Sequence, residues 1–162
     1  MRTSRWKSTL ILVGLGISSS FAVTQAAPAS SGHEAGMGWG APGIASDADR
    51  TVQVTATDVA FDLKRLDVRA GETVRFVVTN KGETDHEFVL ASSAEHAAHE
   101  QEMGSMDPGM AMPDEPNAVS LKPGQTKELV WKFASASDIQ FSCDIPGHAE
   151  QGMKGNIDIK DR

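Results

Sequence analysis

Short runs of alternating apolar and polar residues, separated by turn-forming residues, are the feature that most constrains the fold of this 162-residue chain. In one of the clearest runs, Val74, Phe76 and Val78 share one parity, and the run ends at an Asn-Lys-Gly turn. Because successive side chains of a strand point to opposite faces, this pattern predicts strands with one buried face. About seven or eight such runs follow one another over residues 51–162, enough for two sheets around one core. We therefore predict an all-β domain over these residues, built as a β-sandwich or a barrel.

The first 26 residues have the layout of a secretory signal peptide. Three basic residues, Arg2, Arg5 and Lys7, precede a short apolar run, and small and polar residues follow it up to Ala26. The apolar run is too short to span a bilayer. We therefore expect residues 1–26 to be a cleaved signal peptide, the mature protein to lie in the periplasm, and no segment to be inserted in a membrane.

Residues 27–50 are rich in Gly, Ala and Ser and show little hydrophobic periodicity. This composition predicts a flexible N-terminal arm, with order only near Trp39 to Ile44. His33 and Met37 lie on the arm. They are either incidental residues of a mobile tail or additional metal ligands.

The chain is acidic, with a formal net charge of −7 at pH 7. Removal of the signal peptide would make it more acidic, because that segment contains basic but no acidic residues. A negative surface disfavours binding to nucleic acid and to anionic membranes, and it favours partners with a basic docking surface. We expect the mature protein to be a monomer.

Cys143 is the only cysteine in the sequence. Exported domains usually use cysteines in disulfide-bonded pairs, and a single cysteine cannot form an internal disulfide. Cys143 is therefore either a buried apolar residue or a metal ligand. His148 and Met153 follow it on the same short stretch. A thiolate, an imidazole and a thioether suit copper much better than magnesium or calcium, which prefer oxygen ligands.

His86 is the best candidate for a second imidazole ligand. Cys143 has the same parity as Ile139 and Phe141, so its sulfur is expected to face the core at the end of a strand. His86 has the same parity as Phe88 and is expected to face the core at the start of another strand. The alternative is a structural core histidine with a satisfied hydrogen bond.

Three segments, residues 71–80, 85–90 and 141–153, resemble the cupredoxin family of plastocyanin, azurin and auracyanin. The resemblance covers residues 51–160 and implies a Greek-key β-sandwich. It also implies a type 1 copper site with four ligands: His86, Cys143, His148 and Met153. In such a site two imidazoles and a thiolate surround one redox-active copper, and a thioether is a weak axial ligand.

Two acidic residues, Asp85 and Glu87, flank the first candidate histidine. A carboxylate near an imidazole ligand can fix the orientation of the ring. The alternative is that both acids are solvated loop residues.

Residues 92–117 form an insertion relative to short blue-copper proteins. The insertion contains six candidate ligands for an additional copper: His96, His99, Met103, Met106, Met110 and Met112. Steps of three and four residues predict a helix, which Gly104 and Pro108 end soon after Met103. Thioethers favour Cu(I), and imidazoles help to bind Cu(II). The alternatives are a short helix packed against the domain and a mobile acidic loop. With the motif at 38–43, the insertion resembles periplasmic cupredoxins associated with bacterial copper tolerance.

These features favour a copper-binding protein and not an enzyme. A single domain with one cysteine and no His-x-His pair lacks the ligands of multicopper oxidases and of binuclear copper sites. Two functions remain, namely holding or passing copper in copper tolerance, and carrying single electrons between redox proteins. The expected partner is accordingly a copper donor or acceptor, or a redox protein.

Overall fold

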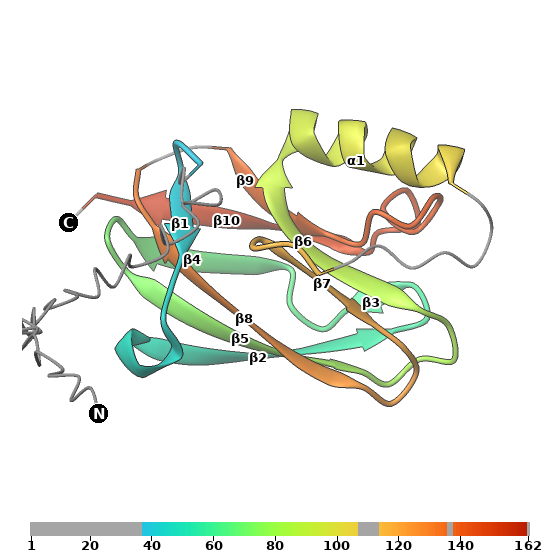
Figure 1. Ribbon diagram of the computed structural model, residues 1–162, viewed down its shortest axis with the longest axis horizontal. Coiled ribbons are helices and arrows are strands. Elements are labelled where there is room, and N and C mark those ends of the chain that lie inside the picture. The colour runs from blue at the N-terminus through green and yellow to red at the C-terminus, as the bar shows by residue number, and fades with distance from the viewer. Residues whose placement is uncertain (1–36, 107–113, 136–137, 162) are drawn as a thin grey trace, which may run out of the picture. The chain divides into compact units, whose positions relative to one another are not determined.

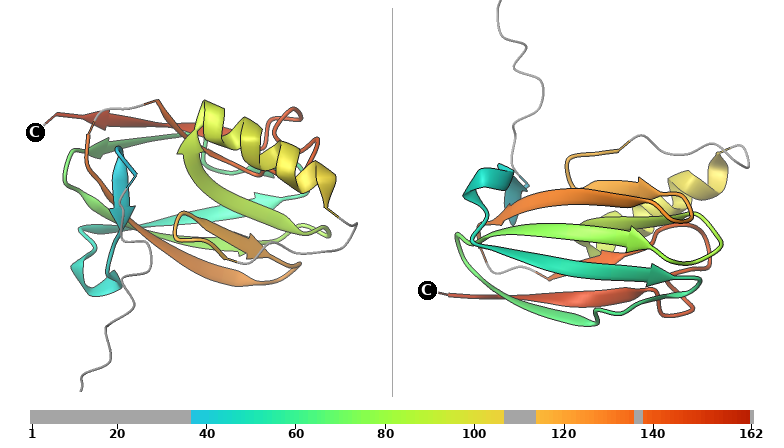
Figure 2. Two further views of the ribbon diagram at one scale, coloured as in Figure 1. Left: turned by 45° about the horizontal axis from the view of Figure 1, so that its top comes forward. Right: turned by 90° about the horizontal axis from the view of Figure 1, so that it is seen from below.

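Two five-stranded sheets pack face to face in the part of the chain that the structure describes (Figures 1 and 2). The structure is a computed structural model, and it describes residues 37–106, 114–135 and 138–161. The predicted signal peptide, His33, Met110 and Met112 lie outside the described residues.

The strand order is β1-β8-β5-β2-β3 in the first sheet and β4-β10-β9-β6-β7 in the second. The first sheet contains β1 (Gly40–Pro42), β2 (Arg50–Thr57), β3 (Ala60–Phe61), β5 (Thr73–Asn80) and β8 (Thr126–Phe133). The second contains β4 (Arg65–Arg69), β6 (His86–Ser92), β7 (Ala118–Leu121), β9 (Ile139–Ser142) and β10 (Lys154–Lys160). The pairs β2–β5 and β4–β10 are parallel, and the other pairs of these strands are antiparallel. The predicted all-β sandwich is confirmed.

The alternation in β5 produces the buried face of the first sheet. Val74, Phe76 and Val78 are fully buried, while Arg75 and Val77 between them are half-buried. The core between the sheets contains four aromatic rings with neighbouring centroids 5.3 to 5.8 Å apart: Phe61, Phe76, Phe88 and Phe141. Since burying one large apolar side chain stabilises a fold by about 1.5–3 kcal/mol, this cluster makes the sandwich a firm scaffold.

The residues just before the predicted domain also belong to the sandwich. β1 pairs with β8, and Trp39 packs on Trp131 with ring centroids 4.7 Å apart. Gly40 lies directly against the Trp131 indole, and a Cβ at this position would clash with the ring. A 3-10 turn, η1 (Ala45–Asp47), leads into β2. Of the predicted arm, residues 37–50 therefore form an edge of the first sheet and its approach.

The insertion between β6 and β7 begins as helix α1 (Ser93–Ser105). Ser92 and Glu95 form a capping box, in which each side chain accepts a hydrogen bond from the backbone N–H of the other residue. The helix ends directly after Gly104, as predicted. It packs on β6 and β9 (Figure 1), and β6 is buried along its length up to Ala91. The predicted, partly helical insertion is confirmed. Among the described residues, no helix is long and apolar enough to cross a membrane.

Candidate metal centre

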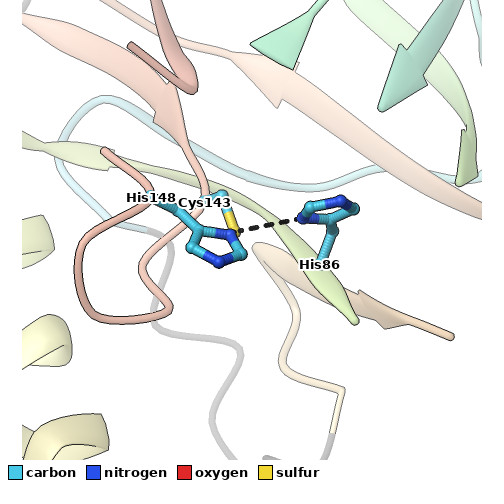
Figure 3. A group of neighbouring side chains, drawn as sticks. All are labelled: His86, Cys143 and His148. Atoms are coloured by element: carbon cyan, nitrogen blue, oxygen red, sulfur yellow. Dashed lines mark hydrogen bonds between the residues drawn. The ribbon is translucent and has the colours of Figure 1, made fainter. Parts of the chain in front are cut away.

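Three of the four candidate ligands lie at strand ends of the second sheet, and the fourth lies in the loop between two of its strands. His86 is the first residue of β6, and Cys143 directly follows β9. His148 lies in the loop between β9 and β10, and Met153 directly precedes β10. His86, Cys143 and His148 lie together where a strand end and the loop after β9 meet (Figure 3).

Three of these side chains form a compact group of metal-binding atoms. One ligand atom from each of His86, Cys143 and His148 lies within 4.8 Å of the others. Cys143 Sγ is 3.4 Å from Nδ1 of His148 and 4.0 Å from Nδ1 of His86, and the rings converge on the sulfur from two sides (Figure 3). The thiol and the His86 ring are fully buried, whereas His148 is partly exposed. His86 is thus more than an isolated core histidine, because it shares this group with a thiol and a second imidazole.

Met153 is tied to the same loop through its backbone. Its carbonyl accepts a hydrogen bond from the Cys143 N–H at 3.0 Å, and its own N–H donates to the His148 carbonyl at 3.1 Å. Its side chain is fully buried. A buried thioether therefore belongs to a residue whose backbone is paired with that of Cys143, at the fourth ligand position that the family resemblance implies.

The loop returns His148 to the thiol through a tight turn at Pro146 and Gly147. Gly147 has a positive φ of 87°, a conformation that residues with a Cβ rarely adopt. The His148 N–H donates to the Ile145 carbonyl at 3.0 Å and closes the turn. The Pro-Gly pair therefore sets the spacing between the two ligand side chains.

Burial controls the protonation of the three groups. It raises the pKa of the Cys143 thiol to about 12, and the nearby charges of Glu87 and Asp144 add to the effect. The backbone N–H of Glu87, which donates to the Cys143 sulfur at 3.4 Å, acts in the opposite direction. Burial lowers the pKa of both His86 and His148, and His86 is further affected by repulsion from His148. Near neutral pH both imidazoles are therefore free to coordinate, while the thiol needs a bound cation to lose its proton.

This donor set fits copper. A thiol, two neutral imidazoles and a buried thioether are soft or borderline donors, and no carboxylate belongs to the group. His86, Cys143 and His148 would hold the ion, with Met153 as a weaker fourth ligand. Copper bound there would supply a one-electron Cu(I)/Cu(II) couple.

The acidic neighbours of the ligands behave differently from one another. Asp85 is exposed, as expected for a solvated loop residue, whereas Glu87 is buried and 4% exposed. Asp144, which the sequence did not single out, is 1% exposed and directly follows Cys143. Its position directly after the candidate ligand Cys143 was the only signal for Asp144 in the sequence.

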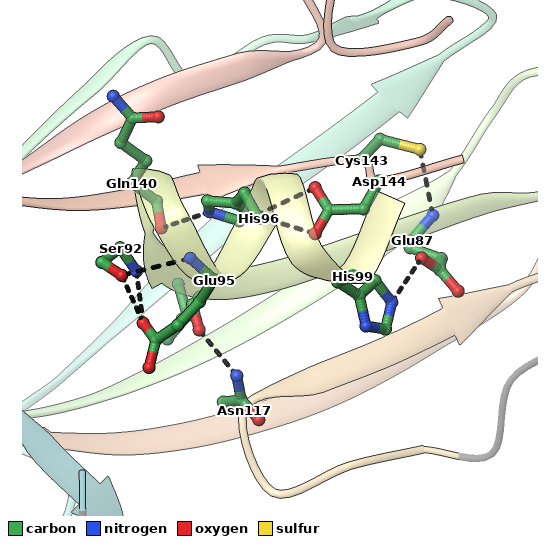
Figure 4. A network of polar contacts seen from close by, with 10 residues as sticks. Glu87, Ser92, Glu95, His96, His99, Asn117, Gln140, Cys143 and Asp144 are labelled. Carbon is green, nitrogen blue, oxygen red and sulfur yellow. Dashed lines mark hydrogen bonds and ion pairs between the residues drawn. The ribbon is translucent and has the colours of Figure 1, made fainter. Parts of the chain in front are cut away.

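The structure gives the histidines of the insertion separate partners. His96 Nδ1 contacts both carboxylate oxygens of Asp144, at 2.8 and 2.9 Å, and His99 Nε2 lies 3.5 Å from Glu87 (Figure 4). The described part of the chain holds no second group of three or more His, Cys, Asp or Glu side chains with metal-binding proximity. The additional copper site stays a prediction. Of its thioethers, Met103 and Met106 are partly exposed at the end of α1.

A pocket beside α1 brings His99 close to a residue of the predicted arm. Its volume is about 260 Å³, and Met37, His99, Glu102 and Glu115 are among its lining residues. Met37 thus lies on the same pocket as one of the predicted secondary ligands, and it is partly buried.

Comparisons with known proteins agree with this site. The model of the family described as copper binding proteins, plastocyanin/azurin family, matches residues 48–160. The copper-resistant cuproprotein CopI of Rubrivivax gelatinosus is 46% identical over 129 residues, which are 79% of this chain and 77% of that protein. CopI of Pseudomonas aeruginosa is 34% identical, with 94% of this chain and 95% of that protein covered.

Among solved structures, auracyanin B has a similar fold. Its TM-score is 0.60 at 24% sequence identity, and the match covers 75% of this chain and 96% of that chain. The resemblance to cupredoxins inferred from the sequence is confirmed, as is copper as the cofactor. The group of one thiol and two imidazoles, the sandwich and these matches lead to one conclusion: the chain belongs to the plastocyanin/azurin family of copper-binding proteins.

Proposed function

We propose that this protein is a periplasmic type 1 copper-binding protein that contributes to copper tolerance through a redox-active site. The observation that carries the proposal is the buried group of His86, Cys143 and His148, whose donors select copper over oxygen-preferring cations. Two CopI proteins described as copper-resistant are similar to this chain over most of its length. The signal-peptide pattern of residues 1–26 supports export to the compartment in which such a protein would act.

The site is suited to withholding copper from other molecules. Buried donors exclude water from most of the ion's surroundings. The cysteine thiol, once deprotonated, binds the copper ion tightly. A bound ion in this position would be kept from exposed thiols elsewhere in the periplasm. We propose no enzymatic reaction, because the donor set already accounts for the buried reactive side chains at this end of the sandwich.

A one-electron carrier is the second candidate function. The observation in its favour is the partial exposure of His148, since the other two members of the group are fully buried. An imidazole in contact with both the copper position and the surface offers an outlet for an electron to a docked protein. For either function we propose a monomer whose partner, a copper donor or acceptor or a redox protein, docks through a basic surface.

Complementation of a deletion strain tests the proposal and separates the candidates. Loss of the gene should make cells sensitive to copper, and the wild-type gene but not the Cys143→Ser variant should restore growth. Restoration by Cys143→Ser would contradict a role for the site in tolerance. Impaired respiration without copper sensitivity would favour the electron carrier. Fractionation of the same strains tests the periplasmic location, which recovery of the protein with the cytoplasm would refute.

A further inference from the structure

Helix α1 runs along the loop that carries three of the four candidate ligands. His96, Glu100 and Gly104 follow one another at steps of four residues, so they share one face of the helix. His96 and Glu100 make hydrogen bonds to the segment from β9 through the Pro146–Gly147 turn, and Gly104 lies near Pro146. The face of α1 that meets the ligand loop is therefore one continuous strip.

The first contact is the strongest and the most buried. His96 Nδ1 donates to the Asp144 carboxylate at 2.8 Å, and its Nε2 faces the Gln140 carbonyl at 3.4 Å (Figure 4). The side chains of His96 and Asp144 are 9% and 2% exposed. Because Asp144 follows Cys143 directly, this pair fixes the backbone next to the thiol. A buried carboxylate that lost its donor would be strongly destabilised.

The other two contacts hold the turn before His148. The Glu100 carboxylate accepts a hydrogen bond from the Gly147 N–H at 3.4 Å. One helical turn later, a Cβ placed on Gly104 would lie 4.0 Å from Pro146 Cγ, so the helix passes close to the turn. Of the two residues that shape the return of His148 to the thiol, Gly147 is therefore hydrogen-bonded to α1 and Pro146 lies near it.

His99, a neighbouring residue of the helix, contacts β6, the strand that begins with the candidate ligand His86. His99 Nε2 lies 3.5 Å from the Glu87 carboxylate, and the Glu87 backbone N–H donates to the Cys143 sulfur (Figure 4). Glu87 directly follows His86 in β6. Through Glu87, Asp144 and Gly147, one helix contacts a residue adjacent to each of His86, Cys143 and His148.

We propose that α1 is a brace for the metal centre, with His96 as its main positioning residue and Glu100 as the second. The insertion then serves the copper site already described, and its two histidines act through carboxylates next to the ligands. This proposal rests on the proposed copper site, but its first test needs no metal. The brace holds the ligand loop in a copper-ready arrangement in the copper-free protein.

Amide hydrogen exchange of the copper-free protein measures the brace directly. In His96→Leu and Glu100→Ala, exchange at Asp144, Gly147 and His148 should be at least about tenfold faster, because a charge-assisted hydrogen bond is lost. His96→Asn keeps a donor near the Nδ1 position and Glu100→Gln keeps an acceptor, so both should exchange more nearly like the wild type. Ala97→Gly is the matched control: it weakens the exposed side of the same helix without removing a contact to the loop.

Spectra of the copper-loaded variants distinguish positioning from a general structural role. His96→Leu and Glu100→Ala should shift the visible charge-transfer band and the reduction potential, and Ala97→Gly should shift neither. Wild-type loop exchange and spectra in both variants, or equal changes in Ala97→Gly, would overturn the brace. If His96→Leu does not fold, the comparison of Glu100→Ala with Glu100→Gln tests the brace, because Glu100 is only half-buried. A wild-type protein without a charge-transfer band would refute the copper site itself, and the exchange data would still test the brace.

Discussion

The two sheets of the sandwich follow the same alternation but are used differently. In the first sheet, the outer side of β5 is half-buried and carries an ion pair between Arg75 and Glu128, with 2.9 Å between Nε and Oε2. In the second sheet, β6 is buried on both faces, because α1 covers its outer side. The four candidate ligands are at strand ends of this second sheet or in the loop between β9 and β10. The first sheet is a scaffold, and the second is a scaffold that also forms the metal centre.

The additional cover explains why acidic residues are buried beside the ligands. Glu87 points away from the sandwich core and would be solvated on an uncovered strand, yet it is 4% exposed under α1. Burial raises its pKa, and the His99 charge opposes that shift. The environment of the centre is therefore set by the insertion as well as by the sandwich.

The largest expected effect belongs to the shared core and should leave the metal centre intact. Phe76 in β5 packs against Phe88 and Phe133 and is fully buried. Phe76→Ala should lower the free energy of unfolding by about 3–5 kcal/mol, because it leaves a cavity between the sheets. Denaturant unfolding of the copper-free protein measures the loss. The visible spectrum of the loaded protein should keep its band positions, and a shifted band would show that the first sheet also shapes the site.

Removal of a ligand from the second sheet should instead weaken copper binding. His86→Ala should weaken copper binding by more than about 100-fold, since even partners of metal ligands are worth 10- to 100-fold. Competition with a chromophoric chelator measures the affinity. Thr79→Ala on the exposed side of β5, where Thr79 bonds to the Thr126 hydroxyl, is the control and should bind copper normally. Equal affinities for the two variants would mean that the first ligand is misassigned.

The sequence predicted the features of the two sheets that depend on short-range patterns, namely the strands and the candidate ligands. The spacing of Cys143, His148 and Met153 and the parity of His86 were enough to nominate the ligands, because a strand fixes the direction of each side chain. The buried state of Glu87 and Asp144 was not predictable from parity, which only says that they point away from the core. It depends on where a helix, distant in sequence from Asp144, crosses the sheet.

The spacing of residues in the sequence also did not predict which face of that helix meets the ligand loop. The His/Met spacing indicated a stripe through His96, His99 and Met103, whereas the residues that meet the ligand loop are His96, Glu100 and Gly104. Both stripes have helical spacing, so only the tertiary contacts separate them.

Copper binding should release a proton from the Cys143 thiol. Between pH 7 and pH 9 the Cys143 thiol, with its pKa raised to about 12, is protonated in the copper-free protein and deprotonated when it binds copper. The lowered pKa values of His86 and His148 keep both rings neutral in this range, so they release none. Affinity should therefore rise about tenfold per pH unit. Calorimetry in buffers of different ionisation enthalpy counts the protons, and pH-independent binding would exclude a thiolate ligand.

The smallest change in stability is expected when a valine on the outer side of each sheet is replaced by threonine. Val89 in β6 is 3% exposed under the insertion, whereas Val77 in β5 is half-buried. Val89→Thr should destabilise the copper-free protein by about 1–2 kcal/mol, because it buries a hydroxyl. Val77→Thr should change stability by less than about 0.5 kcal/mol. Thermal or denaturant unfolding measures both, and equal losses would show that α1 does not seal the outer side of β6.

The central claim is that Cys143, together with His86 and His148, holds one copper as a type 1 centre. Visible absorption and electron paramagnetic resonance spectra of the copper-loaded protein, recorded beside those of Cys143→Ser, test it most directly. We expect an intense thiolate-to-copper charge-transfer band in the wild type and no such band in Cys143→Ser. A band of similar intensity in both proteins, or in neither, would contradict it.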